Sequence, residues 1–271
     1  MLERIGLIAG NGSFPLLFAR TARREGLAVI AVAHEGETDP ALAAEVDSCT
    51  WIKVGQLAAI IGAFQAAGVR RAVMAGGIRK AALMDGFAPD ERALRFLSRL
   101  TQWGDDVLLR GVAEELAAEG IAVVESTLFL ASILTPEGTL TDQGPSPAQW
   151  IDVRHGLAAA KGLGAWDIGQ TVVVKSRIVL AVEALEGTDE TLRRGGALGR
   201  GGAVAVKVSK PNQDLRFDVP AVGPETVAVC RDAGIAVLAL EAGRTLLLDR
   251  KRVLADAAAA ALAIVGVRAD G

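Results

Sequence analysis

Residues 4–26 read RIGLIAGNGSFPLLFARTARREG, which is an apolar run, a glycine turn and an amphipathic segment. The apolar run predicts a buried strand, and Pro15 suits the first turn of the helix that follows. The turn contains Gly10, Asn11 and Gly12 and would present backbone N–H groups to an anion. Because Pro15 and Leu16 replace the third glycine of the dinucleotide fingerprint, a plain strand-to-helix turn remains an alternative.

The same alternation continues through the first half of the chain. Strand-like runs at residues 27–33, 50–54, 71–75 and 121–124 alternate with helical patterns. This order predicts an α/β fold with a mostly parallel, doubly wound sheet flanked by helices. A second glycine turn, Gly76-Gly77, ends the 71–75 run and is followed by Arg79 and Lys80, either of which could reach an anion. Ligands collect at this edge of such sheets.

An acidic pair follows the second strand-like run. Glu35 and Glu37 flank Gly36 just after His34. A dinucleotide enzyme places its ribose-binding acid at this position. A nicotinamide-dependent oxidoreductase, with Glu35 on the ribose, is therefore one alternative function.

Composition excludes several classes of protein. The chain has 271 residues, of which 51% are hydrophobic, and a mean hydropathy of +0.35, yet no apolar run approaches the ~18 residues of a spanning helix. A net charge of −3 argues against nucleic-acid binding. Two histidines and no tyrosine disfavour a histidine metal site or triad, and Cys49 and Cys230 lie too far apart for a metal knuckle. With no signal-peptide pattern, we expect a cytoplasmic protein.

A cluster of Pro, Gly, Thr and Ser at residues 135–147 is the best linker. It predicts two domains, 1–133 and 134–271, the second an α/β domain with a mixed sheet. In that domain we expect a helix over 150–163, a hairpin from 171–174 and 178–184, and a helix that Thr188 or Asp189 caps and that stops at Gly195-Gly196. A second hairpin should join 235–240 to 245–248 through residues 242–244.

Two polar clusters follow apolar runs of the second domain and should border one sheet. They are residues 183–194, EALEGTDETLRR, and residues 207–220, KVSKPNQDLRFDVP. Their cations suit phosphate, and their carboxylates suit a metal ion or proton acceptance, although a solvated hairpin arm is the plainer interpretation. Together with the glycine turns they favour cleavage of a phosphoric anhydride in a crevice between the two halves.

Six segments in chain order carry a resemblance to a known family. They are residues 6–15 (GLIAGNGSFP), 76–77 (GG), 104–106 (GDD), 167–170 (DIGQ), 183–194 and 207–220. Over essentially its whole length the chain resembles the LpxI family, the UDP-2,3-diacylglucosamine pyrophosphatases of bacterial lipid A synthesis. The resemblance implies a Rossmann-like N-terminal domain and a distinct C-terminal α/β domain. It implies Mg²⁺-dependent hydrolysis to UMP and 2,3-diacylglucosamine 1-phosphate (lipid X), with water attacking the β phosphorus. It also implies that Asp218, in the RFDVP sequence, is the catalytic aspartate, as metal ligand or water-orienting base.

The other candidate residues fall into three sets. Gly10, Asn11, Gly12, Gly76 and Gly77 should line the nucleotide side. The pyrophosphate or sugar should face Lys207, Lys210 and Gln213, and the opposite wall should contain Glu183, Thr188 and Asp189.

The expected partners follow from the resemblance. A substrate with two acyl chains implies peripheral contact with the cytoplasmic face of the inner membrane, and a homodimer is one possible assembly. A non-catalytic carrier of UDP-sugars or lipids is a further alternative function.

Overall fold

The computed structural model describes residues 2–79, 87–100, 105–211, 213–217 and 219–269. The chain divides into two compact units. Unit 1 contains Met1–Leu130 and Leu215–Phe217, and unit 2 contains Ala131–Asp214 and Asp218–Gly271. Unit 1 has a parallel sheet and unit 2 a mixed one, so the predicted α/β fold class is confirmed.

Unit 1 is built on a five-stranded sheet in the order β3-β2-β1-β4-β5. All its strand pairs are parallel. The order reverses between β1 and β4, which is where doubly wound sheets bind ligands. The strands are β1 (Arg4–Ala9), β2 (Ala28–His34), β3 (Ser48–Ile52), β4 (Arg71–Ala75) and β5 (Ala122–Val123).

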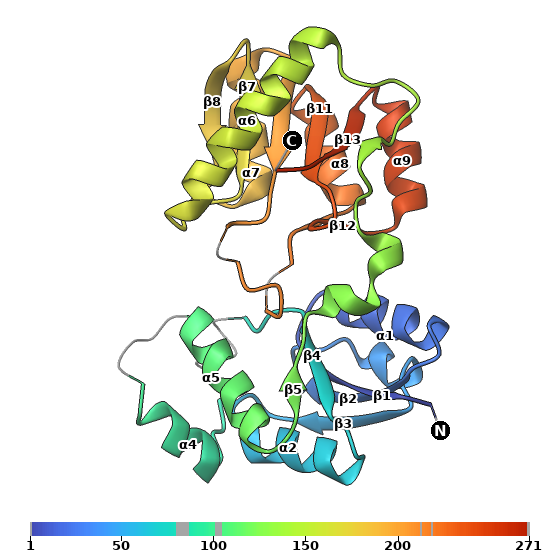
Figure 1. Cartoon of the computed structure of the whole chain (residues 1–271), viewed down its shortest axis with the longest axis vertical. Coiled ribbons are helices and arrows are strands. Elements are labelled where there is room, and N and C mark those ends of the chain that lie inside the picture. The colour runs from blue at the N-terminus through green and yellow to red at the C-terminus, as the bar shows by residue number, and fades with distance from the viewer. Residues whose placement is uncertain (1, 80–86, 101–104, 212, 218, 270–271) are drawn as a thin grey trace. The chain divides into compact units, whose positions relative to one another are not determined.

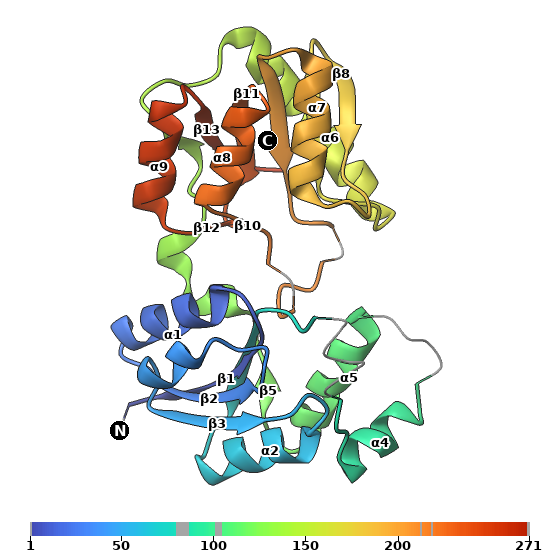
Figure 2. The same ribbon diagram turned by 180° about the vertical axis from the view of Figure 1, so that it is seen from behind.

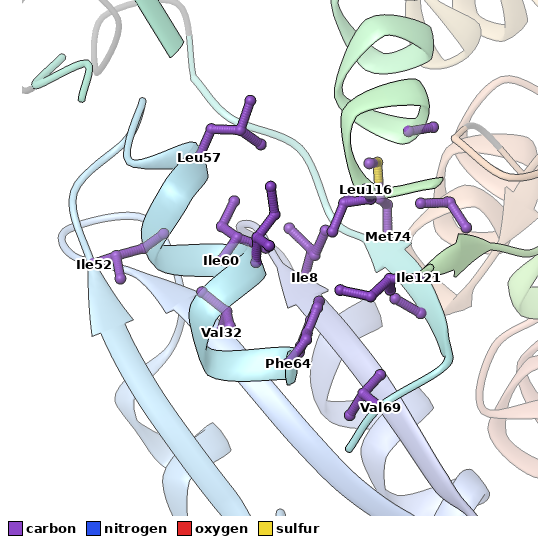
Figure 3. Close-up of a cluster of buried hydrophobic side chains, with 14 of the residues drawn as sticks. Ile8, Val32, Ile52, Leu57, Ile60, Phe64, Val69, Met74, Leu116 and Ile121 are labelled. Carbon is purple, nitrogen blue, oxygen red and sulfur yellow. The ribbon is translucent and has the colours of Figure 1, made fainter. Parts of the chain in front are cut away.

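Helices cover both faces of this sheet, which explains why its strands are nearly continuous apolar runs. Figures 1 and 2 show α1 on one face and α2 on the other. Figure 3 shows the core beneath α2, where Ile60 and Phe64 meet Ile8 and Val32 of the strands. Phe217 packs against the same core, in keeping with its place in unit 1. The helical elements are α1 (Phe14–Arg24), η1 (Pro40–Ala44), α2 (Leu57–Ala66), α4 (Glu91–Leu97), α5 (Asp105–Ala118) and η2 (Ser126–Phe129).

Unit 2 contains a six-stranded sheet in the order β6-β13-β11-β9-β7-β8. Its central strands β13, β11 and β9 run parallel, whereas β6, β7 and β8 pair antiparallel to their neighbours. Both polar clusters border this sheet, as predicted, because one follows β8 and the other follows β9. The strands are β6 (Gly138–Thr139), β7 (Thr171–Lys175), β8 (Ile178–Val182), β9 (Ala203–Lys207), β11 (Ile235–Glu241) and β13 (Ala263–Val267).

One predicted hairpin of unit 2 is confirmed and the other is wrong. The β7–β8 turn places Ser176 and Arg177 at positive φ, and the buried carboxylate of Asp152 accepts both their N–H groups at 2.9 and 2.6 Å. By contrast, residues 242–244 do not close a hairpin. Strand β12 (Leu246–Leu247) pairs in parallel with β10 (Ala221–Val222) in a separate sheet, while β11 lies between β9 and β13.

Helix α6 covers one face of the six-stranded sheet and α7, α8 and α9 cover the other (Figures 1 and 2). Ser146 and Gln149 form a capping box, so α6 begins earlier than predicted. None of the helices within the described ranges is long and apolar enough to cross a membrane. The helical elements are η3 (Ala131–Ile133), α6 (Pro147–Ala165), α7 (Thr188–Gly199), α8 (Pro224–Asp232) and α9 (Arg250–Ala259).

The expected N-cap of α7 is wrong, since Gly187 is the N-cap and Thr188 and Asp189 lie in the first turn. The expected stop at Gly195-Gly196 is also wrong, since the helix continues to Gly199. A Cβ atom on Gly195 would lie 2.4 Å from Cβ of Val173, and one on Gly196 would lie 2.1 Å from the carbonyl oxygen of Ala233. These glycines therefore allow close packing of α7 against β7 and α8.

Candidate functional site

The two predicted glycine turns of unit 1 lie against each other at the carboxyl ends of β1 and β4. Gly10 N donates to Ala75 O at 2.8 Å, and Asn11 N donates to Gly77 O at 2.7 Å. A Cβ atom on Gly10 would lie 2.2 Å from Gly77 O, and one on Gly76 would lie 2.2 Å from Asn11 O. Glycine is therefore required for this approach of two backbones. The N–H groups of Gly10 and Asn11 bind the protein itself, whereas the sequence predicted that this turn presents them to an anion.

Gly12 differs from the other glycines of these turns. Its φ is +81° and no atom would lie within 4 Å of an added Cβ. Its requirement is therefore conformational, since a positive φ favours glycine.

The buried carboxylate of Glu37 connects the loops that follow β1, β2 and β4. Its two oxygens accept hydrogen bonds from Arg79 N and Nε, both at 2.8 Å, and from Asn11 Nδ2 at 3.1 Å. The bonds from Arg79 hold the pKa of Glu37 below its usual range. Arg79 also donates to Gly36 O, so this predicted phosphate-binding cation is paired within the protein, and Lys80 lies outside the described residues.

His34 and Thr38 hold the end of β2 to the end of β1. His34 Nδ1 and Thr38 Oγ1 both donate to Ala9 O, at 2.8 and 2.6 Å. Burial lowers the pKa of His34, which favours the neutral imidazole. Sequence reasoning assigned no role to either residue.

A pocket of about 770 Å³ opens beside these loops in unit 1. Glu35, which immediately follows β2, contributes to its lining, and Trp51 contributes from the edge strand β3. The pocket thus combines carboxylates, one guanidinium and one indole. Its lining includes Asn11, Glu35, Glu37, Asp39, Trp51 and Arg79.

In unit 2, three predicted site residues form a hydrogen-bonded chain at the start of α7. Lys207 Nζ donates to Thr188 Oγ1 at 3.0 Å, and Thr188 Oγ1 donates to Glu183 Oε1 at 2.9 Å. The sequence placed Lys207 and Thr188 on facing walls, whereas here they bond directly. Lys207 and Glu183 are only 7% and 8% exposed, whereas Asp189 is exposed.

Glu183, the last member of this chain, and Gln170, the residue before β7, each have an oxygen without a hydrogen bond from the described residues. Glu183 Oε2 and Gln170 Oε1 are buried and have no partner among the residues that the structure describes. Buried polar atoms are nearly always hydrogen-bonded, so an open acceptor such as Glu183 Oε2 indicates a place for a ligand's donor or for a cation.

Lys210 and Gln213 lie further along the 207–220 cluster, in the loop after β9. Gln213 Oε1 accepts from Lys210 N at 2.9 Å, and Lys210 Nζ pairs with Asp167 at 2.6 Å. Nearby, Lys161 Nζ bonds both oxygens of the buried Glu241 at 2.7 Å. Sequence reasoning missed this pair, because two ordinary charges 80 positions apart carry no local signal.

The predicted catalytic residue Asp218 lies outside the described residues, so its role stays a prediction. Across the described ranges, no group of three or more His, Cys, Asp and Glu side chains could hold a metal ion.

Fold and polar groups together define a two-unit α/β protein whose polar residues gather where strands end, as in α/β proteins that bind phosphorylated ligands. The LpxI N-terminal domain model matches residues 4–133, and the LpxI C-terminal domain model matches residues 136–265. The chain is 34% identical over 278 residues to "UDP-2,3-diacylglucosamine pyrophosphatase LpxI" of Caulobacter vibrioides, covering 98% of both chains. The chain belongs to the LpxI family.

Among solved structures, a biotin carboxylase complex from Campylobacter jejuni is similar with a TM-score of 0.30 and 16% identity. It covers 73% of this chain, which spans only 42% of that protein's length. N5-carboxyaminoimidazole ribonucleotide synthetase from Thermotoga maritima has a TM-score of 0.26 and 13% identity, covering 68% of this chain and 42% of that one. Likeness at this level carries no functional argument.

Proposed function

We propose that this chain hydrolyses UDP-2,3-diacylglucosamine to UMP and 2,3-diacylglucosamine 1-phosphate in lipid A biosynthesis. The observation that carries the proposal is membership of the LpxI family over both domains, with a relative of that name aligned over 98% of its length. The reaction adds water across one phosphoric anhydride and needs no redox cofactor. That chemistry agrees with a site made of lysines, carboxylates and amides.

The polar groups of unit 2 suit a substrate that carries a diphosphate and a sugar. Lys207 provides a buried positive charge for phosphate oxygens, because desolvation strengthens its attraction for an anion. The open oxygen of Glu183 can accept a hydrogen bond from a sugar hydroxyl or from the attacking water. The hydrogen bond from Lys210 N to Gln213 Oε1 would hold the loop after β9 in place beside the substrate.

Attack on either phosphorus would give the same products, and the resemblance to the LpxI family favours the β phosphorus. The oxygen of water forms a bond to the β phosphorus, the bond from that phosphorus to the bridging oxygen breaks, and UMP leaves with the bridging oxygen. Asp218 would orient the water and accept its proton or hold a metal ion. Hydrolysis in H₂¹⁸O should place the label in the lipid phosphate, and label in UMP would contradict this direction of attack.

Mg²⁺ is part of the proposal. Enzymes often hold this ion through one or two carboxylates together with substrate phosphates and water, so a full protein cage is unnecessary. Asp218 is the proposed ligand, and Glu183 offers a second oxygen of a suitable kind. Bound Mg²⁺ would neutralise phosphate charge.

The test is release of UMP from UDP-2,3-diacylglucosamine by the purified chain. We expect release with Mg²⁺, loss with EDTA, and a fall of at least about 10³-fold in Asp218→Ala with folding intact. Asp142→Ala, which removes an exposed aspartate of unit 2, is the matched control. Substrate binding without UMP release would favour a carrier, and nicotinamide absorbance changes would favour an oxidoreductase.

The acyl chains of the substrate place it in a membrane, so the enzyme would meet it at the cytoplasmic face of the inner membrane. Co-sedimentation with phospholipid vesicles that contain the substrate, but not with vesicles lacking it, would support this location. Equal sedimentation with both would indicate general lipid affinity instead.

A further inference from the structure

The unit 1 pocket lies at the carboxyl ends of four strands of the parallel sheet. Asn11 follows β1, Glu35 follows β2, Trp51 is near the end of β3, and Arg79 follows β4. Its volume of about 770 Å³ is within the range of small-molecule sites. Because the N–H groups of Gly10 and Asn11 are used within the protein, side chains must supply much of its binding chemistry.

Trp51 gives the pocket a flat apolar surface. The residue pairs with Ala33 in the register of β3 with β2, and its side chain is half-buried on this edge strand. An indole that lines a polar pocket is well suited to stack on a planar heterocycle.

Glu35 lies next to this surface. Its backbone N–H donates to Ile52 O at 2.9 Å, which fixes the acid beside the strand that carries Trp51. The side chain is exposed, unlike that of Glu37. An acid at the end of the second strand is where doubly wound sheets bind ribose hydroxyls.

The charge of the lining limits what the pocket can hold. Among the described lining residues, Glu35, Glu37 and Asp39 face the guanidinium of Arg79, which Glu37 already neutralises. Such a lining repels a bare phosphate or an anionic headgroup. It suits a neutral ligand rich in hydroxyl donors, with any phosphate kept toward the rim at Asn11 and Arg79.

We propose that this pocket binds the nucleoside part of a nucleoside phosphate, with the base on Trp51 and the ribose hydroxyls on Glu35. Under the proposed function, on which this identification of the base rests, the ligand is the uridine of UDP-2,3-diacylglucosamine. Asp39, an exposed member of the lining, offers a second carboxylate for the ribose, and its Oδ1 accepts from Ala41 N at 2.9 Å.

Calorimetry with UMP and with 2′,3′-dideoxy-UMP tests the ribose contact. Glu35→Gln should weaken UMP binding roughly tenfold and leave binding of the dideoxy nucleotide unchanged, because only UMP carries the hydroxyls. Glu25→Gln, which alters an exposed glutamate elsewhere in unit 1, should leave both affinities unchanged. Equal effects of Glu35→Gln on the two nucleotides would overturn the contact.

Trp51→Leu tests the base contact. The substitution should weaken the binding of both nucleotides roughly tenfold, because it removes the stacking surface, and should leave the circular dichroism spectrum unchanged. AMP is the competing probe, and tighter binding of AMP than of UMP would overturn the uridine assignment.

The pocket and the hydrolase can fail separately. If both variants release UMP and bind UMP normally, the nucleoside-pocket proposal is overturned and the hydrolase proposal stands. If the variants lose UMP binding but the wild-type chain does not cleave the lipid substrate, the hydrolase proposal is overturned and the nucleoside-pocket proposal stands.

Discussion

The carboxyl edges of the two sheets use their buried carboxylates in opposite ways. In unit 1, Glu37 accepts three hydrogen bonds from Arg79 and Asn11. In unit 2, Glu183 accepts one from Thr188, and its second oxygen is open among the described residues. A satisfied carboxylate stabilises the loops around it, whereas an unsatisfied one costs stability and is retained where a ligand completes it. Because both Glu37 and Glu183 are buried, burial alone does not distinguish a structural carboxylate from a candidate site carboxylate.

Unit 2 contains both kinds within one sheet. Glu241 accepts hydrogen bonds from Lys161 Nζ and from Ser209 N at 2.7 Å. Among the described residues, Glu183 accepts one from Thr188 and its second oxygen accepts none.

Lys161→Ala should be the most damaging change. It leaves the Glu241 side chain, 4% exposed, without its close cation, and removing one partner of a buried ion pair costs about 3–5 kcal/mol. Urea unfolding of the variant measures the loss. Arg252→Ala, which breaks an exposed pair with Asp256, is the control and should cost less than about 1 kcal/mol. A loss no larger than that of the control would show that the pair does not hold this edge of unit 2.

Gly76→Ala should destabilise unit 1 by about 2–3 kcal/mol. The added Cβ would meet Asn11 O at 2.2 Å, and the residue has a φ of +80°. Thermal unfolding measures the loss. Gly62→Ala is the control, because no atom would lie within 4 Å of its Cβ inside α2 and alanine is the better helix former. If both variants unfold at the same temperature, the two glycine turns are not locked as described.

Glu37→Gln should lower the stability of unit 1 by about 1–2 kcal/mol at neutral pH. Its folded-state pKa is lowered by the hydrogen bonds from Arg79, so its contribution is present above the unfolded-state pKa and is lost as pH falls through the folded-state pKa. The variant should therefore lose less stability than the wild type between neutral pH and acid. Urea unfolding over that range measures this, with Glu25→Gln as the control for one lost surface carboxylate. Parallel pH profiles for wild type and Glu37→Gln would contradict the assignment.

Glu183→Gln should raise stability by about 1 kcal/mol, since it removes a poorly satisfied buried charge, while UMP release falls at least about tenfold. Denaturation and turnover of the same preparation give the two values. Glu190→Gln, on the exposed side of α7, should change neither by much. A variant that loses stability without losing activity would make Glu183 a structural acid like Glu37.

The fold could be predicted wherever one segment settles its own structure. The run of residues 4–26 specified a strand, a turn and a helix locally, and the apolar runs of the first half specified a parallel sheet. The second hairpin was mispredicted because apolar strands near in sequence can pair with other strands, as β11 does with β9 and β13. The boundary near residue 134 stays a prediction.

The polar groups at the strand ends were predictable from the sequence, but their hydrogen-bond partners were not. The glycine turns and the residues Glu183, Thr188 and Lys207 were visible as patterns beside strand ends. The bonds of Glu37 to Arg79 and of Lys161 to Glu241 join positions 42 and 80 apart, so only the folded chain reveals them. The role of Asp218 stays a prediction.

The paired glycines inside α7 have a consequence for mutational drift. Thr188 lies seven residues before Gly195 on the same helix, about 10 Å along its axis. A bulkier residue at Gly195 would push the helix away from Val173 and displace the hydroxyl between Lys207 and Glu183 without touching either charge. Substitutions that change no charge can thus disturb the hydrogen bonds of Lys207, Thr188 and Glu183. A survey of inactive variants should therefore include the buried surface of α7 at Gly195 and Gly196.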